Sequence, residues 1–543
     1  MSGPLTLVGP SPEVRALFAG FSQVDDPVVS EFISSMPERF SDAANHLASQ
    51  RILVSDIIMQ NRMMLKSFIK KFHSEAGTLT DAVRSNIELL DDSATRIFVS
   101  THQPNLFAYG GVFKKIVLLE TLKTVVERDN KGSRAVNLFL VVDHDFVDEP
   151  WVRLAQLPSI QHSSGIMELR LPVSESMRWK MVCNMPVPSH RVVNNWKSQI
   201  RSWIKKNALD KNKKIFLDNL DQFWQQVETS YARAVSYADL NSFLMSKVIN
   251  GTWNYGTLFV RLSEMQGVFG NGFEFLISNS DKYSEALRFA ESEFRYHGIN
   301  TGVSSSSHLN APVWLHCSCG SKGSVKIAKK GPEILLAGYC ISCKKEMELN
   351  IGNFENLTIG KNLHNMSPRA IPIPLLLSRD LAISSYASGV GGIGYLVDGV
   401  VVAKKLGLAM PLVLVWPSRD VYNGIAQSRA LAFMPAQDID LYLQSLKDKN
   451  AEYEKRIIPV LSRKAEKVRA AEPISDLLAQ LFQLKKEQRR IRQQINDAEK
   501  IMNAVNLSPC LVDYAVNFGL ARLEETWRNH LIKDGGLASP ITF

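Results

Sequence analysis

Two apolar segments separated by a helix-length stretch place the strongest constraint on the fold of this 543-residue chain. The first is short and covers residues 97–99. The second, "AVNLFLVV" at 135–142, is apolar almost throughout, which is typical of a strand buried on both faces of a parallel sheet. The spacing of apolar residues between them predicts a helix over 114–126, ended by the turn-forming "RDNKGS". Strand, helix and strand in this order predict a right-handed βαβ unit.

Polar and glycine residues follow the first predicted strand, where open α/β sheets hold their ligands. Glycine at a helix start permits close backbone approach, and lysine in a first helical turn is disfavoured by the helix dipole. We therefore expect Lys114 and Lys115 to serve an anion rather than the helix. The predicted substrate- or nucleotide-binding residues of this segment are His102, Gln103, Asn105, Gly110, Gly111 and Lys114.

An Asp-His-Asp sequence follows the second predicted strand, at Asp143, His144 and Asp145. A histidine between two carboxylates can act as a general base, bind a metal ion or hold a proton in place. Because this triplet is paired with the polar exit of the first strand across one βαβ unit, we predict that these three residues are catalytic.

A third segment, "SYASGVGGIGYL", contains a G-x-G-x-x-G pattern at Gly389, Gly391 and Gly394. A strand is expected before it, over 381–386, and a helix after it, ending near Leu406. This context lets backbone amides approach a phosphate. A tight strand-to-helix turn without a ligand is the alternative.

Four of the six cysteines lie in one short window, which indicates a metal site rather than a disulfide framework. Cys340 and Cys343 have the C-x-x-C spacing of a zinc knuckle, and thiolates suit zinc. Cys317 and Cys319 are closer than usual, so either His316 or Cys317 completes the set with Cys319. We predict a structural zinc ribbon, with a metal-free thiol cluster as the alternative.

A heptad pattern runs through the region after residue 436 and predicts a coiled coil. Pro459 and Pro473 interrupt it, so two antiparallel helices fit better than one rod. The apolar seam consists of Leu477, Leu481, Leu484, Gln488, Ile491, Ile495, Ala498 and Met502.

The composition is that of a globular protein, with 45% hydrophobic and 22% charged residues and a net charge of +9. This charge is compatible with anionic small ligands or with nucleic acid. No apolar run reaches the length of a membrane span and no signal segment opens the chain, so we expect a cytoplasmic protein without a membrane partner. The expected organisation is a helical region at 1–92, a core at 93–305 and 356–435, a zinc-ribbon insertion at 306–355, a coiled coil at 436–505 and a helical segment at 506–543.

In their order, these motifs resemble those of the bacillithiol synthase family. "QPNLFAYGG", "VDHDF", "GVGGIGYL" and "WPSRD" stand where that family has corresponding segments, and the last of them points to Arg419. Val142 and Gly392 stand where the family has glutamate, the zinc ribbon is not part of its usual pattern, and "HQPN" is more similar to the start of the WbqC-like proteins of surface-glycan loci.

The resemblance implies an α/β protein with a Rossmann-like parallel-sheet core and an α-helical coiled-coil domain that can pair chains into a homodimer, and the cysteine spacing adds an inserted zinc ribbon. The implied activity is that of a ligase joining cysteine to the amine of glucosaminyl-malate. The expected cofactors are an adenine nucleotide and the structural zinc that the cysteines predict. Two alternatives stay open: a nucleotide-dependent enzyme of surface-glycan assembly, and a non-catalytic scaffold that binds nucleic acid or protein. Further binding residues are expected at Gly389, Gly391, Gly392, Gly394, Tyr395 and Arg419.

Overall fold

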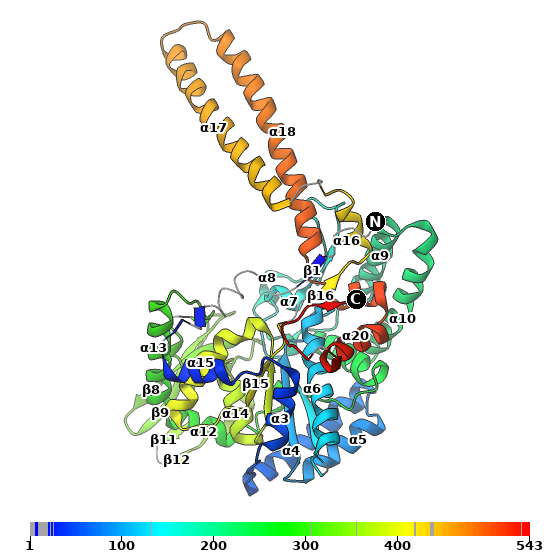
Figure 1. Ribbon diagram of the computed structural model, residues 1–543. Helices are drawn as coiled ribbons and strands as arrows, with labels where there is room; N and C mark the ends of the chain where they lie inside the picture. Colours follow the sequence, from blue (N-terminus) through cyan, green and yellow to red (C-terminus); the bar gives the residue numbers. More distant parts are fainter. Residues whose placement is uncertain are drawn as a thin grey trace.

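A five-stranded sheet, parallel throughout, lies at the centre of the computed structural model (Figure 1). The strands are β2 (Arg96–His102), β3 (Ala135–Val141), β6 (Leu258–Arg261), β14 (Ser385–Ser388) and β15 (Leu412–Val415), in the spatial order β15-β14-β2-β3-β6. The chain therefore adds strands on one side of β2 and then on the other, and the direction reverses between β2 and β14. The structure describes residues 6–8, 20–21, 23–24, 26–130, 132–304, 306–353, 356–417, 420–434, 439–533 and 535–543.

The predicted βαβ unit is present, with α6 (Gly110–Asp129) joining β2 to β3. Successive residues of a strand point to opposite faces of a sheet, and here both faces are buried. Phe98 and Phe139 belong to a hydrophobic core on one face, whereas Val99 and Leu138 belong to a second core on the other. This two-sided burial explains why the strand at 135–142 is almost continuously apolar.

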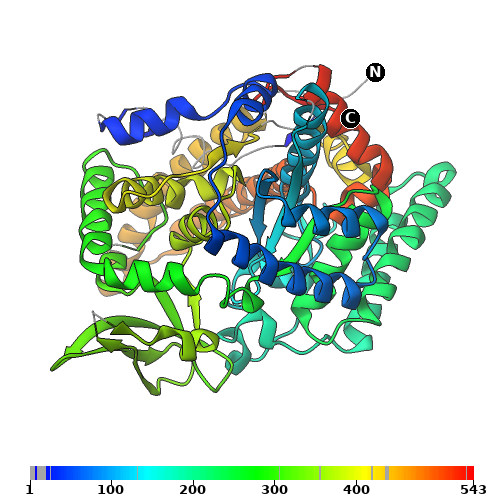
Figure 2. The same cartoon turned by 90° about the horizontal axis from the view of Figure 1, so that it is seen from below.

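Helices cover both faces of the sheet (Figure 2). The core that contains Phe98 is built with α3 (Phe40–Ser49), α6, α9 (His190–Asn207), α10 (Lys213–Tyr231), α11 (Tyr237–Ser246), α19 (Leu511–Phe518) and α20 (Leu520–Lys533). The core that contains Val99 is built with α2 (Pro27–Ser35), α5 (Asp81–Glu88), α12 (Gly270–Ser278), α13 (Ser280–Tyr296), α14 (Pro372–Leu381) and α15 (Ile393–Leu406). Helix α4 (Asp56–Ala76) contributes to both cores.

Two short apolar runs show that sequence patterns do not separate helix from strand. The run "FEFLISN" at 273–279 is compatible with a strand or a short apolar segment, but it lies almost entirely in α12, where Phe273, Leu276 and Ile277 have helical spacing and pack into the core. The strand expected over 381–386 starts only at Ser385, because α14 extends to Leu381. Short apolar runs satisfy helix and strand patterns alike, and packing decides between them.

The cysteine-containing segment folds into an antiparallel five-stranded sheet, ordered β10-β9-β8-β7-β13. Its strands are β7 (Val313–His316), β8 (Lys322–Lys330), β9 (Glu333–Cys340), β10 (Glu346–Asn350) and β13 (Met366–Pro368). We call this sheet, with its turns, the cysteine module. Leu315, Val325 and Leu336 belong to the same hydrophobic core as Val99 of the central sheet, so the module packs directly on the α/β body.

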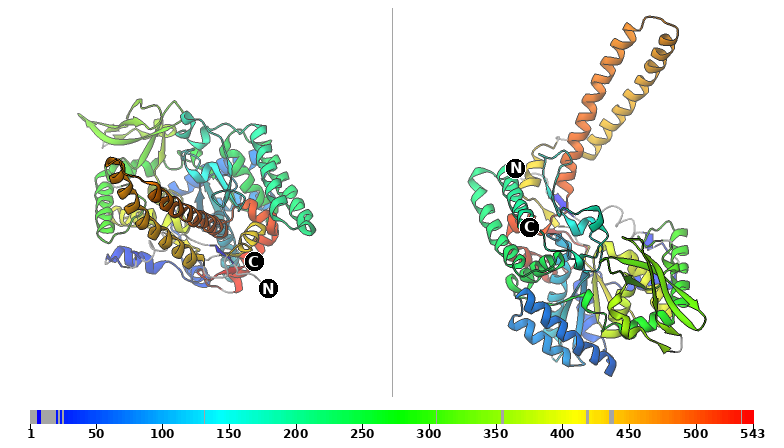
Figure 3. Two further views of the ribbon diagram at one scale, coloured as in Figure 1. Left: turned by 90° about the horizontal axis from the view of Figure 1, so that it is seen from above. Right: turned by 180° about the vertical axis from the view of Figure 1, so that it is seen from behind.

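Two long helices, α17 (Ile439–Arg469) and α18 (Ser475–Asn506), lie side by side and project from the body as a hairpin (Figures 1 and 3). The chain turns at 470–474, which includes Pro473. Pro459 lies inside α17 and does not end it. A small core of Ile457, Val460, Leu481 and Leu484 joins the two helices.

Smaller elements connect these parts. Strands β1 (Thr6–Val8), β16 (Asp420–Tyr422) and β17 (Ile541–Thr542) form one sheet, which brings both ends of the chain together. The others are the β4 (Leu154–Pro158) and β5 (Ile166–Arg170) hairpin, β11 (Gly352–Asn353) with β12 (Asn356–Leu357), and the short helices α7 (Pro150–Arg153), α8 (Glu175–Arg178) and α16 (Ile425–Leu431). Among the described residues, no helix combines the length and the apolar character needed to cross a membrane.

Candidate functional site

Three of the predicted motifs follow neighbouring parallel strands. They lie at the carboxyl ends of these strands, where the strand order reverses. Gln103 follows β2, Asp145 follows β3 and Gly389 follows β14. The amide nitrogen of Gln103 donates a hydrogen bond of 2.8 Å to Oδ2 of Asp145. This contact joins the exits of the first and second strands and defines the centre of the candidate site.

Asp145 is the acid of the Asp-His-Asp sequence that lies nearest to solvent, with 30% of its side chain exposed. Its Oδ1 lies 3.7 Å from Nζ of Lys322, which comes from β8 of the cysteine module. The Lys322 ammonium lies over the rings of Phe146 and Trp314, at 4.7 and 4.8 Å from their centroids. Burial lowers the pKa of Lys322 to about 8, although the charge of Asp145 acts to raise it.

Asp143, by contrast, is fully buried. The backbone N–H of Ser263, just after β6, donates a hydrogen bond of 2.9 Å to its Oδ1, and the Ser263 hydroxyl donates to its Oδ2. Burial raises the pKa of Asp143 to about 6, against the effect of these hydrogen bonds. Asp143 therefore ties the exit of β3 to the exit of β6.

His144 is 2% exposed and lies close to the cysteine module. Its Nδ1 has no hydrogen-bond partner among the described residues. Burial, together with the charges of Lys322 and His316, holds the pKa of His144 well below its usual range. His144 is thus a neutral imidazole at pH 7, and its predicted catalytic role stays a prediction.

The end of β2 also carries a neutral histidine, His102, which is half-buried. Nε2 of His102 lies 3.3 Å from the hydroxyl of Tyr109, and burial, with the charge of Lys115, lowers the pKa of His102 to about 3. Lys115 donates a hydrogen bond of 2.7 Å to the carbonyl oxygen of Thr101. Asn105 is 2% exposed, and neither its amide nitrogen nor its amide oxygen has a partner in the described part of the chain.

Lys114 forms an ion pair with a carboxylate of its own chain. Its Nζ lies 3.0 Å from Oδ1 of Asp420 and over the Trp416 ring at 4.9 Å. The hydroxyl of Tyr514 donates to the other oxygen of Asp420. Because α6 begins at Gly110, Lys114 lies beyond the first helical turn, and the expectation that it binds a ligand has no support from these contacts.

The glycines at the start of α6 are explained by packing. A Cβ at Gly110 would lie 2.7 Å from the ring of Tyr514, and a Cβ at Gly111 would lie equally close to the ring of Tyr109. Both positions therefore require a residue without a side chain, whether or not a ligand is bound.

The glycine-rich motif between β14 and α15 divides into two parts. A Cβ at Gly389 or Gly391 would meet nothing within 4 Å, so both backbones border open space. A Cβ at Gly392 would lie 2.6 Å from Oγ of Ser388, and one at Gly394 would overlap the backbone of Thr301. The first two glycines therefore remain candidates for phosphate contact, whereas Gly394 serves packing.

Tyr395, at the end of the glycine-rich motif, lies near groups that follow the other two strands. Burial raises its pKa, and the neighbouring groups of Tyr386, Asp145 and Tyr109 add to this effect. The hydroxyl of Tyr386 in turn lies 2.7 Å from that of Thr101 at the end of β2. Arg419, the last of the predicted binding residues, lies outside the described residues.

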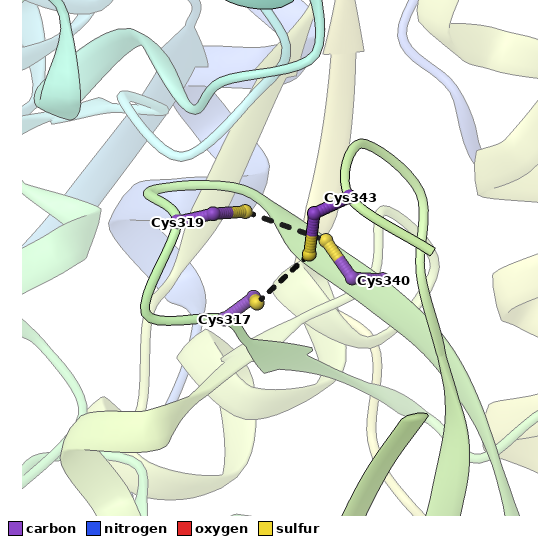
Figure 4. A group of neighbouring side chains, drawn as sticks. All are labelled: Cys317, Cys319, Cys340 and Cys343. Carbon is purple, nitrogen blue, oxygen red and sulfur yellow. Dashed lines mark hydrogen bonds between the residues drawn. The ribbon is translucent and has the colours of Figure 1, made fainter. Parts of the chain in front are cut away.

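The four cysteines point toward one another from two turns of the cysteine module (Figure 4). All four Sγ atoms lie within 4.8 Å of one another, with Cys317 3.7 Å from Cys343 and Cys319 3.5 Å from Cys340. His316 is not in this group, so the candidate metal site consists of the four cysteines, with Cys317 among them. Four thiolates can hold a metal ion such as zinc, and a full set of protein ligands is typical of a structural site.

Sequence reasoning missed Lys322 and Ser263, which contact Asp145 and Asp143. Neither residue belongs to a recognisable motif. Only the packing of distant segments brings them to the carboxyl ends of the central strands. No family model matches this chain, and no curated protein matches it. The functional proposal therefore rests on the geometry at the carboxyl ends of the central strands.

Proposed function

We propose that this protein is a ligase-type enzyme that joins the carboxyl group of cysteine, or of a similar amino acid, to the amine of a sugar acceptor such as glucosaminyl-malate. The observation that carries the proposal is the contact between Gln103 and Asp145, beside the glycine-rich turn after β14. In chain order the strands lie 3-2-1-4-5, as in Rossmann-like sheets, where ligands bind at the reversal of strand order. The proposed site is at that reversal.

Amide formation from a free carboxylate is uphill in water, so the carboxyl group needs activation. An adenine nucleoside triphosphate would supply it, with its phosphates beside Gly389 and Gly391, where the backbone borders open space. The acceptor nitrogen then attacks the activated carboxyl carbon. A carbon–nitrogen bond forms, the carbon–oxygen bond to the phosphate-bearing leaving group breaks, and the nitrogen loses a proton.

Asp145 is the group best placed to handle that proton. Its carboxylate is partly exposed, can bind the ammonium form of the acceptor and can take up the proton released during attack. The Gln103 amide fixes one carboxylate oxygen and leaves the other toward Lys322. His144, which is buried and neutral, would orient this segment rather than contact the acceptor.

The proposal is tested by incubating the purified protein with cysteine, glucosaminyl-malate and ATP. Mass spectrometry should detect a product whose mass equals the two substrates minus one water. Asp145→Asn should lower kcat/KM by about 100-fold or more, because the isosteric amide cannot accept the proton.

Asp218→Asn is the matched control, since it makes the same change at an exposed carboxylate of α10. It should retain wild-type activity. The absence of any product with the wild-type protein, or equal activity in both variants, would refute the proposal.

A further inference from the structure

We infer that the cysteine module completes the proposed site, with Lys322 as the residue that positions Asp145 and the metal ion as the element that fixes both. The activity measurement below rests on the proposed function, whereas the exchange measurement does not. Two separate chains of contacts connect the metal-binding turns to the Asp-His-Asp segment.

The first chain of contacts runs through Lys322, which lies between the two cysteine turns. The carbonyl oxygen of Ser321, just before it, accepts a hydrogen bond of 2.8 Å from the N–H of Cys317. The carbonyl oxygen of Lys322 itself accepts one of 3.2 Å from the N–H of Ile341, next to Cys340. A metal ion that holds the two turns together therefore fixes the backbone of Lys322 from both sides.

The side chain of Lys322 is buried, at 2% exposure, and lies at the proposed site. An ammonium has three N–H donors, but within the described residues the carboxylate that pairs with it is Asp145, at 3.7 Å. Glu149 lies nearby: burial and the charges of Asp145 and Asp148 raise its pKa, and the charge of Lys322 acts to lower it. Lys322 thus supplies a buried positive charge to a segment rich in carboxylates, and its loss would leave Asp145 without its ion pair.

The second chain of contacts runs through Gly320, which closes the first cysteine turn in the left-handed region at φ 85°. Its carbonyl oxygen accepts hydrogen bonds of 3.0 Å from the N–H of Met181 and from the side-chain amide of Asn184. This turn therefore holds residues 181–184.

Residues 181–184 in turn hold the backbone of the catalytic segment. The N–H of Val182 donates a hydrogen bond of 2.9 Å to the carbonyl oxygen of Asp145, and that of Cys183 donates one of 2.7 Å to the carbonyl oxygen of Asp143. The metal centre is thereby connected to Asp145 at its side chain, through Lys322, and at its backbone, through 181–184. A change in the metal centre should reach Asp145 by both routes.

Three variants test the role of Lys322. Lys322→Gln should lower kcat/KM by about 10- to 100-fold, as the loss of outer-shell partners commonly does, with the larger part of the loss in kcat. Lys322→Arg keeps the positive charge and should recover part of that loss. Lys326→Gln removes an exposed lysine from the same strand and should have wild-type activity. Equal kinetics for Lys322→Gln and Lys326→Gln would overturn the inference.

The role of the metal ion is tested without any assay of activity. The intact protein is treated with a chelator, its metal content is measured, and amide hydrogen exchange is followed in the native protein. Removal of the metal should accelerate exchange of the N–H groups of Met181, Val182 and Cys183, and added Zn²⁺ should restore their protection. The amides of α10, which lies outside the module, should be unaffected.

Unchanged exchange at 181–183 after the metal has been removed would overturn the coupling between the metal centre and the site. If the wild-type protein made no amide product but its exchange responded to the metal as described, the proposed function would fail and the positioning role would stand.

Discussion

Gly389 and Gly394 belong to one sequence pattern but have different surroundings. Open space borders Gly389, whereas the backbone of Thr301 fills the position that a side chain at Gly394 would need. A pattern of glycines shows only that side chains are absent. It does not indicate whether a ligand or another part of the chain occupies the space. The surroundings of each glycine supply that distinction.

A pair of alanine substitutions tests this difference. Gly394→Ala should lower the free energy of unfolding by about 1 to 3 kcal/mol, because the added methyl group forces the backbone apart. Gly389→Ala should leave it within about 0.5 kcal/mol, since the methyl group enters open space and the backbone there has an ordinary φ of −77°. Urea denaturation measures both changes. Equal destabilisation by the two variants would contradict the packing role of Gly394.

Several site residues could be predicted from the sequence because strand exits follow directly from apolar patterning. Gln103 and Asp145 were expected at neighbouring exits, and they form a hydrogen bond. Lys322 could not be found in this way, because it lies in another sheet and reaches the site only through tertiary packing. Lys114 was expected to serve an anion and pairs with Asp420 of its own chain, so its role toward a ligand stays a prediction.

The hairpin of α17 and α18 is held by few residues. Leu484 is 7% exposed and packs with Ile457, Val460 and Leu481, whereas Phe482 on the same helix is 65% exposed. The predicted seam identified the buried leucines correctly, because heptad spacing places them on one side of the helix. It did not show that α17 continues through Pro459, since a proline can remain inside a helix when packing compensates for the lost hydrogen bond.

Truncation of Leu484 should therefore open the hairpin locally. Leu484→Ala is expected to cost about 2 kcal/mol and to accelerate amide exchange in both helices, because its small core has little else to replace the lost contacts. Phe482→Ala removes an exposed ring and should change stability by about 0.5 kcal/mol at most. Exchange in the central sheet should be the same in both variants. If Leu484→Ala accelerated exchange in the central sheet as much as in the hairpin, the hairpin would not be a separate cooperative unit.

The molecule as a whole combines a central parallel sheet, a cysteine module packed on it and a projecting hairpin (Figure 3). The sheet could be predicted because burial on both faces leaves a nearly continuous apolar signal in its strands. The packing of the cysteine module on the central α/β body could not be predicted, because the strands of the module alternate in polarity like those of any small antiparallel sheet. What the sequence presents as an insertion contributes Lys322 to the proposed site.

The most direct test of this account is a calorimetric titration of the intact wild-type protein and of Asp145→Asn with glucosaminyl-malate, in the presence and absence of ATP. We predict that the wild-type protein binds this acceptor, that ATP strengthens the binding, and that Asp145→Asn weakens it at least tenfold. Binding of neither ligand by the wild-type protein, or the same affinities in the variant, would contradict the placement of the acceptor amine at Asp145.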